Sequence, residues 1–179
     1  VSSTIDAIPE NFKDIDILIN NAGLALGLNP AYQADLEDWE TMIDTNIKGL
    51  IYLSRFILPG MVERKRGHII NIGSTAGKEV YPKGNVYCAS KHAVDAINQS
   101  LRIDLNAYGV RVGAVNPGLV QTEFSEVRFK GDTERARGVY QGYQPLTPQD
   151  IAEIIDFVIS RPRHVNIADL VVMPTDQAS

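Results

Sequence analysis

Three short apolar segments, each ending at a small or turn-forming residue, most constrain the fold of this chain. They lie at 15–19, 68–72 and 110–115, and long stretches of helical character at about 36–66 and 85–108 separate them. Parallel strands need crossover connections of this length, and strands buried on both faces read as continuous apolar runs. The pattern therefore predicts an α/β domain built on a parallel sheet.

The remaining elements follow from the turn and cap residues. We expect a helix over 3–12, loops over 24–34 and 119–143, a helix over 148–160 and a last strand over 170–173, with weak helical pieces in the second loop. Thr147 and Pro148 fit the N-cap and first position of a helix, and Gly109 fits a helix stop. An Asn amid apolar helical residues is unfavourable, so the helix over 36–66 is expected to be interrupted near Asn46.

The unusual residues of the chain gather at the predicted strand ends. Asn-Asn-Ala-Gly closes the first strand at 20–23, Ser74 follows the second, and Pro-Gly at 117–118 closes the third. In an open parallel sheet, ligands bind at the carboxyl ends of the strands. The sequence therefore predicts the functional site at this edge.

Tyr87 and Lys91 stand four residues apart in the run YCASK, 13 residues after Ser74. At that spacing two side chains share one face of a helix. A nearby ammonium stabilises a phenolate and lowers the pKa of a Tyr, so the pair is a plausible proton donor and acceptor. Such a pair alone is common on helix surfaces, and its position beside Ser74 makes it a candidate site.

The ordered motifs NNAG, DTNIKG, the serine of HIINIGS, YCASK and NPGLVQT resemble the signature of the short-chain dehydrogenase/reductase family. The segments EFSEVRFKGD and VNIADLVVMPTDQAS resemble its branch of NADP-dependent dehydrogenases acting on serine, allo-threonine and other short 3-hydroxy acids. The resemblance implies a Rossmann-like, doubly wound parallel sheet. It also implies an oxidoreductase that transfers hydride between NADP(H) and an alcohol or carbonyl, with NAD left open as the cofactor.

The resemblance assigns four catalytic residues. Tyr87 would take and return the hydroxyl proton, and Ser74 would hydrogen-bond the substrate oxygen. Lys91 would lower the pKa of Tyr87 and bind the nicotinamide ribose, while Asn46 would break its helix and hold a water that relays protons to Lys91. No metal is expected, because the three histidines form no paired-ligand motif.

Cofactor and substrate residues are implied in the same way. The cofactor residues would be Asn21, Ala22, Gly23, Tyr87, Lys91, Pro117, Gly118, Val120 and Thr122. The segment 124–143 lies where the family has its substrate lid. Because Arg binds carboxylates in a bidentate fork, Arg128 or Lys130 is expected to help Ser74 hold a hydroxy acid. For Arg135 and Arg137, a role as solvated charges on a loop is at least as well supported as substrate binding. Tyr143 and Gln144 are further candidates for the pocket.

At its N-terminal end the sequence differs from the family pattern. The family begins with a strand, a glycine-rich turn and a helix that hold the pyrophosphate, and this chain opens at VSSTIDAIPENF. We therefore expect residues 1–179 to be a single, N-terminally truncated domain. Two other functions stay open: another reductase of the family, acting on 3-oxoacyl thioesters, sugars or steroids, and a catalytically silent dinucleotide-binding protein.

Composition narrows the partners. A net charge of −5 argues against general nucleic-acid binding, and no apolar stretch is long enough to predict a membrane span. The single cysteine, Cys88, fits a reducing compartment, so a cytoplasmic location is expected. The resemblance further implies a homotetramer in which the helices over 47–66 and 85–108 pair with their equivalents.

Overall fold

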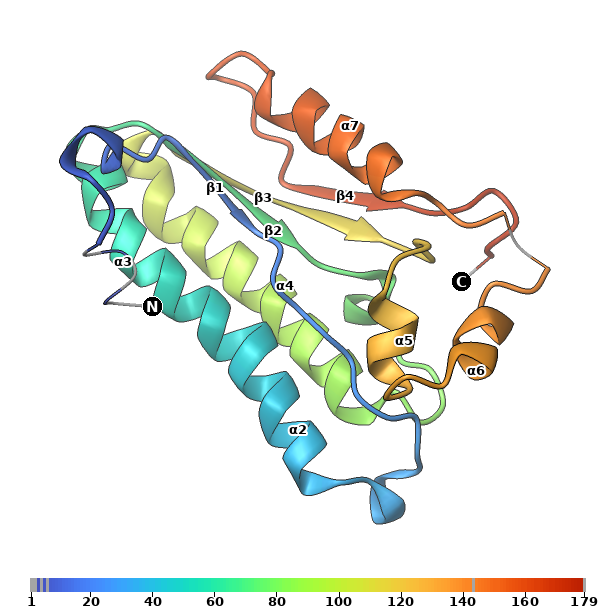
Figure 1. The fold of residues 1–179 in the computed structure, drawn as a ribbon. Coiled ribbons are helices and arrows are strands. Elements are labelled where there is room, and N and C mark those ends of the chain that lie inside the picture. Colours follow the sequence, from blue (N-terminus) through green and yellow to red (C-terminus); the bar gives the residue numbers. More distant parts are fainter. Residues whose placement is uncertain (1–2, 4, 6, 143, 179) are drawn as a thin grey trace.

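The computed structural model describes residues 3, 5, 7–142 and 144–178, and its centre is a parallel sheet (Figure 1). The strands are β1 (Ile17–Asn20), β2 (Gly67–Ile72), β3 (Val110–Pro117) and β4 (Asp169–Val172), paired in the order β1-β2-β3-β4. All three pairings are parallel, with Asn20 beside Asn71 and Pro117 beside Val172. The predicted parallel α/β fold is confirmed, and the strand ends meet at one edge.

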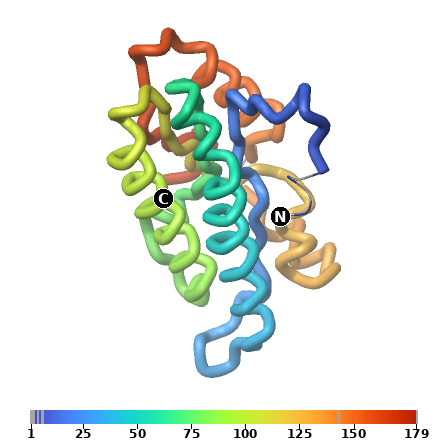
Figure 2. Tube along the Cα trace, turned by 90° about the vertical axis from the view of Figure 1, so that its left-hand side faces the viewer, coloured from blue at the N-terminus to red at the C-terminus, as the bar shows by residue number. Residues whose placement is uncertain are grey.

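Helices cover both faces of this sheet, as a doubly wound fold requires. The helices α3 (Leu50–Glu63) and α4 (Asn85–Leu105) lie side by side on one face, and α7 (Pro148–Ile159) lies on the other (Figures 1 and 2). On the first face Ile69 packs in a buried cluster with Ile57 and Met61 of α3. On the second face Ile70 packs with Val158 of α7. Alternate residues of β2 therefore build two separate cores.

The long helix before β2 is interrupted where the sequence predicts. The helix α2 (Leu36–Ile43) passes into a π-helical turn, Asp44–Gly49, and then continues as α3. A π turn inserts one extra residue and is common at functional sites. Here it carries the buried Asn46 into the interior.

The expected helix ends are also confirmed. The helix α4 runs into a 3₁₀ turn, Asn106–Tyr108, and ends at Gly109, whose φ of 68° is left-handed. Thr147 caps α7 by accepting a hydrogen bond from the Asp150 backbone N–H, and the Asp150 carboxylate accepts one from the Thr147 N–H in return. This reciprocal pair is a capping box.

The remaining segments are short helices and loops. The predicted loop over 24–34 holds only a 3₁₀ turn, Ala31–Gln33, and the segment after β3 holds α5 (Phe124–Arg128) and α6 (Thr133–Gly138). The helix expected over 3–12 falls partly outside the described residues, which include a 3₁₀ turn at Glu10–Phe12. Among the described helices, none is both long enough and apolar enough to cross a membrane.

Candidate active site

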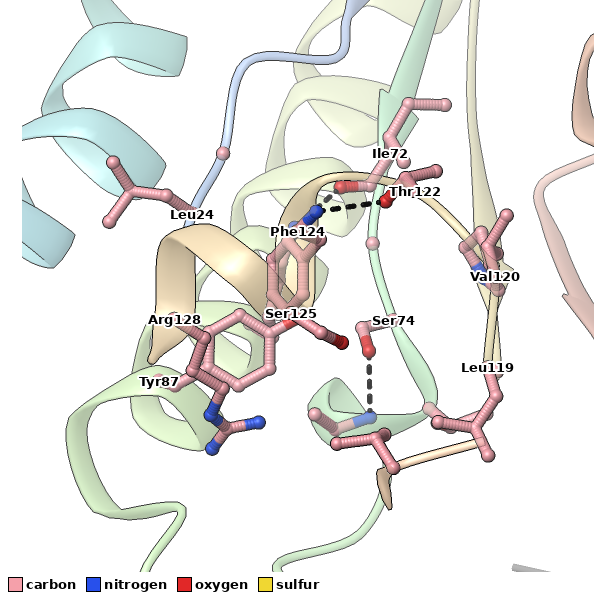
Figure 3. Close-up of a pocket in the computed structure, with 18 of the residues that line it drawn as sticks. Leu24, Ile72, Ser74, Tyr87, Leu119, Val120, Thr122, Phe124, Ser125 and Arg128 are labelled. Atoms are coloured by element: carbon pink, nitrogen blue, oxygen red, sulfur yellow. Dashed lines mark hydrogen bonds between the residues drawn. The ribbon is translucent and has the colours of Figure 1, made fainter. Parts of the chain in front are cut away.

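A cavity of about 1120 Å³ opens at the carboxyl ends of β1, β2 and β3, beneath α5 (Figure 3). Most of the residues predicted from the sequence line it. They are Asn21, Gly23, Ser74, Tyr87, Lys91, Pro117, Gly118, Val120, Thr122 and Arg128. Three other predicted residues, Ala22, Asn46 and Lys130, do not line it.

Tyr87 lies in the first turn of α4 and is 7% exposed. Its ring packs against the Phe124 ring at 5.6 Å between centroids. Burial raises the pKa of Tyr87 to about 12, and a hydrogen bond with Ser74 opposes that shift only in part. The structure therefore does not show the expected lowering of this pKa by Lys91: removal of the phenolate from water sets the direction, and the interactions that oppose it come from Ser74 and Arg128.

Lys91 lies one helical turn beyond Tyr87 and is equally buried. Its Nζ donates a hydrogen bond to the Ile72 carbonyl at 3.0 Å, at the end of β2. A Cβ placed on Gly23 would lie 3.4 Å from the same Nζ, so the ammonium also adjoins the end of β1. Burial lowers the pKa of Lys91 to about 8, and no carboxylate of the described residues forms an ion pair with it.

Ser74 lies two residues beyond the end of β2, in an extended conformation, and caps the 3₁₀ turn Thr75–Gly77. Its Oγ accepts a hydrogen bond from the Ala76 backbone N–H at 3.1 Å, which fixes the rotamer. That contact uses only a lone pair of the oxygen, so the hydroxyl hydrogen can be donated to the neighbouring Tyr87 or to a ligand. Ser74 and Tyr87 therefore present two hydroxyl groups to the same cavity (Figure 3).

Asn46 anchors the site from behind. Its Oδ1 accepts from the Leu24 N–H at 2.8 Å, and its Nδ2 donates to the Leu24 carbonyl at 2.8 Å and to Ser90 Oγ at 3.0 Å. Both amide hydrogens are thereby used, so the side chain has none left for a relay water. The proton relay through Asn46 stays a prediction. With its side-chain hydrogens used, Asn46 would have to hold such a water through its main-chain atoms.

Sequence reasoning missed the residues that hold the catalytic candidates in place. Ser90 accepts from Asn46, which ties α4 to the π turn, and donates to the Tyr87 carbonyl at 2.7 Å within α4. Its signal was available, since a buried Ser in mid-helix usually bonds back to the preceding turn. Gln177 accepts from the Leu119 N–H at 2.9 Å, and its Oε1 occupies the place of a Cβ on Gly118. No local pattern indicates that long-range contact.

The structure separates the two predicted substrate residues. Arg128 lines the cavity, whereas Lys130 forms ion pairs with Asp38 at 2.8 Å and Asp35 at 3.9 Å. Lys130 is therefore an anchor of the lid and does not reach the cavity. Gln144 is exposed and does not line the cavity, and Tyr143 lies outside the described residues.

The residues present fit the nicotinamide side of a dinucleotide. Lys91 brings a buried ammonium that has one hydrogen-bond acceptor among the residues that the structure describes, which suits the paired hydroxyls of a ribose. Gly23 and Gly118 contribute only backbone to the neighbouring walls, with the Gln177 side chain packed against Gly118. No group of three or more His, Cys, Asp or Glu side chains in the described part of the chain could hold a metal ion.

The comparison with known families decides the class. A family model described as short chain dehydrogenase matches residues 1–133. The chain belongs to the short-chain dehydrogenase family. It is accordingly an oxidoreductase that acts on CH–OH groups, and the predicted Rossmann-like fold is confirmed.

Two proteins from other organisms are similar in sequence over almost the whole chain. A protein of Salmonella typhi called NADP-dependent 3-hydroxy acid dehydrogenase YdfG is 55% identical over 179 residues, covering 99% of this chain and 72% of that protein. A Schizosaccharomyces pombe protein called NADP-dependent 3-hydroxy acid dehydrogenase is 45% identical, covering 99% of this chain and 68% of its own.

Solved structures agree in fold. The closed form of a serine dehydrogenase complexed with NADP+ gives a TM-score of 0.97 at 54% identity, over 99% of this chain and 72% of that one. A structure of serine dehydrogenase from Escherichia coli gives a TM-score of 0.84 at 48% identity over the same shares. The fold of this chain is thus the one that these enzymes use.

Proposed function

We propose that this enzyme catalyses the NADP-dependent oxidation of a short 3-hydroxy acid, such as serine or allo-threonine, and the reverse reduction. The observation that carries the proposal is the meeting of Ser74, Tyr87 and Lys91 in one cavity at the strand ends. The names of the similar proteins support the cofactor and the substrate class.

The protein groups divide the proton chemistry among them. Tyr87 accepts the hydroxyl proton of the substrate in oxidation and returns it in reduction. Ser74 donates a hydrogen bond to the substrate oxygen and stabilises its developing negative charge. NADP, when bound, supplies the hydride acceptor or donor at its nicotinamide ring.

Lys91 and Asn46 support these two hydroxyls. Lys91 binds the ribose hydroxyls and places a positive charge near the Tyr87 phenolate, which favours proton loss during oxidation. Asn46 holds the loop after β1 at a fixed distance from α4 through Leu24 and Ser90. We further propose that the following residues at the strand ends also bind the cofactor: Asn21, Ala22, Gly23, Pro117, Gly118, Val120 and Thr122.

Turnover by the full-length protein tests the function. L-serine, L-allo-threonine and 3-hydroxypropionate are offered with NADP+ or NAD+, and NADPH or NADH formation is followed beside a Tyr87→Phe variant. We expect oxidation that prefers NADP+ and is lost in the variant. Reduction of a bulkier carbonyl without turnover of these acids would instead support another reductase of the family. Cofactor binding without any turnover would support a silent dinucleotide-binding protein.

We also propose that copies of the chain assemble through the outer faces of α3 and α4. The residues Ile51, Tyr52 and Phe56 of α3 and Ile103 of α4 are all large, apolar and exposed. Apolar patches of this kind favour association. Light scattering of the purified protein tests it: a tetramer is expected, and a monomer at all concentrations would contradict the assembly.

A further inference from the structure

The charged side chains that line the cavity differ in burial and in ion pairing. Four charged side chains line it: Glu79, Lys91, Glu123 and Arg128. The two glutamates are exposed, whereas Lys91 is buried and Arg128 is half-buried. Within the described part of the chain, no carboxylate forms an ion pair with Arg128. A partly desolvated guanidinium without a counterion favours an anionic ligand.

Arg128 is held firmly in this position. It is the last residue of α5, and its Nε donates to the Gly27 carbonyl at 3.2 Å while the Gly27 N–H donates back to the Arg128 carbonyl at 2.9 Å. The guanidinium carbon lies 5.4 Å from the centre of the Tyr81 ring and 5.6 Å from that of Tyr87. Both contacts are within the range of cation–π attraction. The loop over 24–34 and two aromatic rings therefore orient the guanidinium.

The guanidinium of Arg128 has only neutral partners among the described residues. Its Nε donates to the Gly27 carbonyl, and an interaction with the Tyr81 hydroxyl opposes the rise in the pKa of Tyr81 that burial causes, so the guanidinium still lacks an anion. Figure 3 shows the guanidinium beside the Tyr87 ring, and Ser74 lines the same cavity. An anion bound there would lie next to the hydroxyl groups that handle the proton.

The other cations of the lid are engaged elsewhere. Lys130 pairs with Asp38, and the Arg135 guanidinium stacks over the Phe129 ring at 4.4 Å. Arg137 is exposed, and neither it nor Arg135 lines the cavity. Among the described basic residues of the lid, Arg128 alone both lines the cavity and has no anionic partner.

We propose that Arg128 is the residue that makes this enzyme select acids: its guanidinium binds the substrate carboxylate while Ser74 and Tyr87 hold the 3-hydroxyl. The inference rests on the proposed function, because it concerns the same site. In a 3-hydroxy acid a single carbon separates the carbinol from the carboxylate. Its two polar ends must therefore meet neighbouring side chains, as Tyr87 and Arg128 are.

Discrimination follows from the same geometry. A planar guanidinium accepts a carboxylate through two parallel hydrogen bonds, which fixes the orientation of the substrate as well as its charge. A neutral thioester, sugar or steroid would cover the guanidinium without pairing it. Leaving a site's buried polar group unpaired is the strongest way to reject a substrate. Arg128 therefore favours acids over the neutral substrates of other family members.

The test compares an acid with its ester. Full-length wild type and Arg128→Met are assayed with 3-hydroxypropionate and with its methyl ester, which has the same carbinol and no charge. Charged hydrogen bonds of this kind account for a factor of about 10 to 100 in binding, so kcat/KM for the acid should fall by about that factor through KM. The value for the ester should fall much less than that for the acid, because the ester loses only the influence of Arg128 on the Tyr87 phenolate. Arg135→Met, from the same lid, is the control and should leave both unchanged.

The outcomes separate the two proposals. If wild type oxidises neither compound nor any related acid, the proposed function and this inference both fail. If wild type oxidises the acid but Arg128→Met loses acid and ester equally, or loses neither, the function stands and Arg128 is not the carboxylate ligand. A measurement on wild type alone guards against a misfolded variant: propionate should inhibit at much lower concentration than 1-propanol. Equal inhibition by the two would overturn the assignment.

Discussion

Replacing Lys91 by Met should make the cofactor-free enzyme more stable while removing its activity. Lys91 is 7% exposed as a residue, and its ammonium donates one hydrogen bond to Ile72 and has no ion-pair partner among the described residues. Met has a similar length and no charge, so it can occupy the same space without the cost of burying an ion.

The magnitude comes from the pKa of Lys91, which burial lowers from 10.5 to about 8. A lowered Lys pKa means that protonation favours the unfolded chain. That cost is fully present below about pH 8 and disappears as the pH rises through 10.5. The difference between the two values corresponds to about 3 kcal/mol at pH 7, as an upper limit, since the bond to Ile72 is also lost. For a chain of this size, that is a rise in Tm of roughly 6–12 °C.

Thermal unfolding of cofactor-free wild type and Lys91→Met, at pH 7 and at pH 10, measures this difference. The variant should be more stable at pH 7, and its advantage should shrink at pH 10. Lys78→Met is the control, because Lys78 pairs with Asp95 at 2.7 Å and Asp169 at 2.8 Å, and its loss should not stabilise. A Lys91→Met protein less stable than wild type at pH 7, or an advantage independent of pH, would refute the reasoning.

Three further changes probe other parts of the fold. Ser90→Ala removes a buried acceptor and donor at once, so Tm should fall by roughly 2–10 °C, whereas the exposed Ser100→Ala on the same helix should be neutral; equal Tm values would contradict the role of Ser90. Gly118→Ala puts a Cβ where Gln177 Oε1 lies and displaces the end of this flexible side chain, which lines the cavity. NADPH binding, followed by fluorescence, should therefore weaken with little loss of Tm. Unchanged affinity would contradict the role of Gly118 in the cofactor site. Burial lowers the pKa of His68 from 6.5 to about 4, so folding stability is complete above pH 6.5 and falls as the pH drops toward 4. His68→Leu should flatten that fall in urea unfolding at pH 7 and 4.5, and an unchanged slope would rule out His68 as its source.

The fold was predictable because its signals are local. Apolar runs between helical stretches give the parallel strands, and Gly109 and Thr147 mark helix ends through backbone geometry and capping that depend on a few neighbouring residues. Asn46 indicated the interruption before α3, because an amide side chain is costly among apolar helical residues. The weak helical pieces expected over 119–143 correspond to α5 and α6, but their bounds were not predictable, since these segments are too short and polar to show an apolar period.

The candidate site was predictable in membership but less so in electrostatics. The strand ends and the spacing of Tyr87 and Lys91 placed most of the lining residues, because parallel strands carry their ends to one edge. The direction of the Tyr87 pKa was not accessible, since burial depends on Phe124, which lies 37 residues further along the chain. The choice between Arg128 and Lys130 likewise needed Asp38, a residue of α2.

The opposite pKa shifts of Tyr87 and Lys91 bear on how the site works. Burial raises one to about 12 and lowers the other to about 8, so each shift favours the neutral form of its group. Before ligands bind, the phenol therefore keeps its proton at neutral pH, which suits proton donation in the reductive direction. Oxidation needs the phenolate, which the Arg128 cation favours in this structure and which we propose that the ammonium of Lys91, one helical turn away, also favours. Binding the substrate carboxylate neutralises Arg128 and leaves the ammonium of Lys91 as the charge that pulls the proton from Tyr87. On this account Lys91 remains in the core, despite its cost to stability, because the reaction requires a cation there.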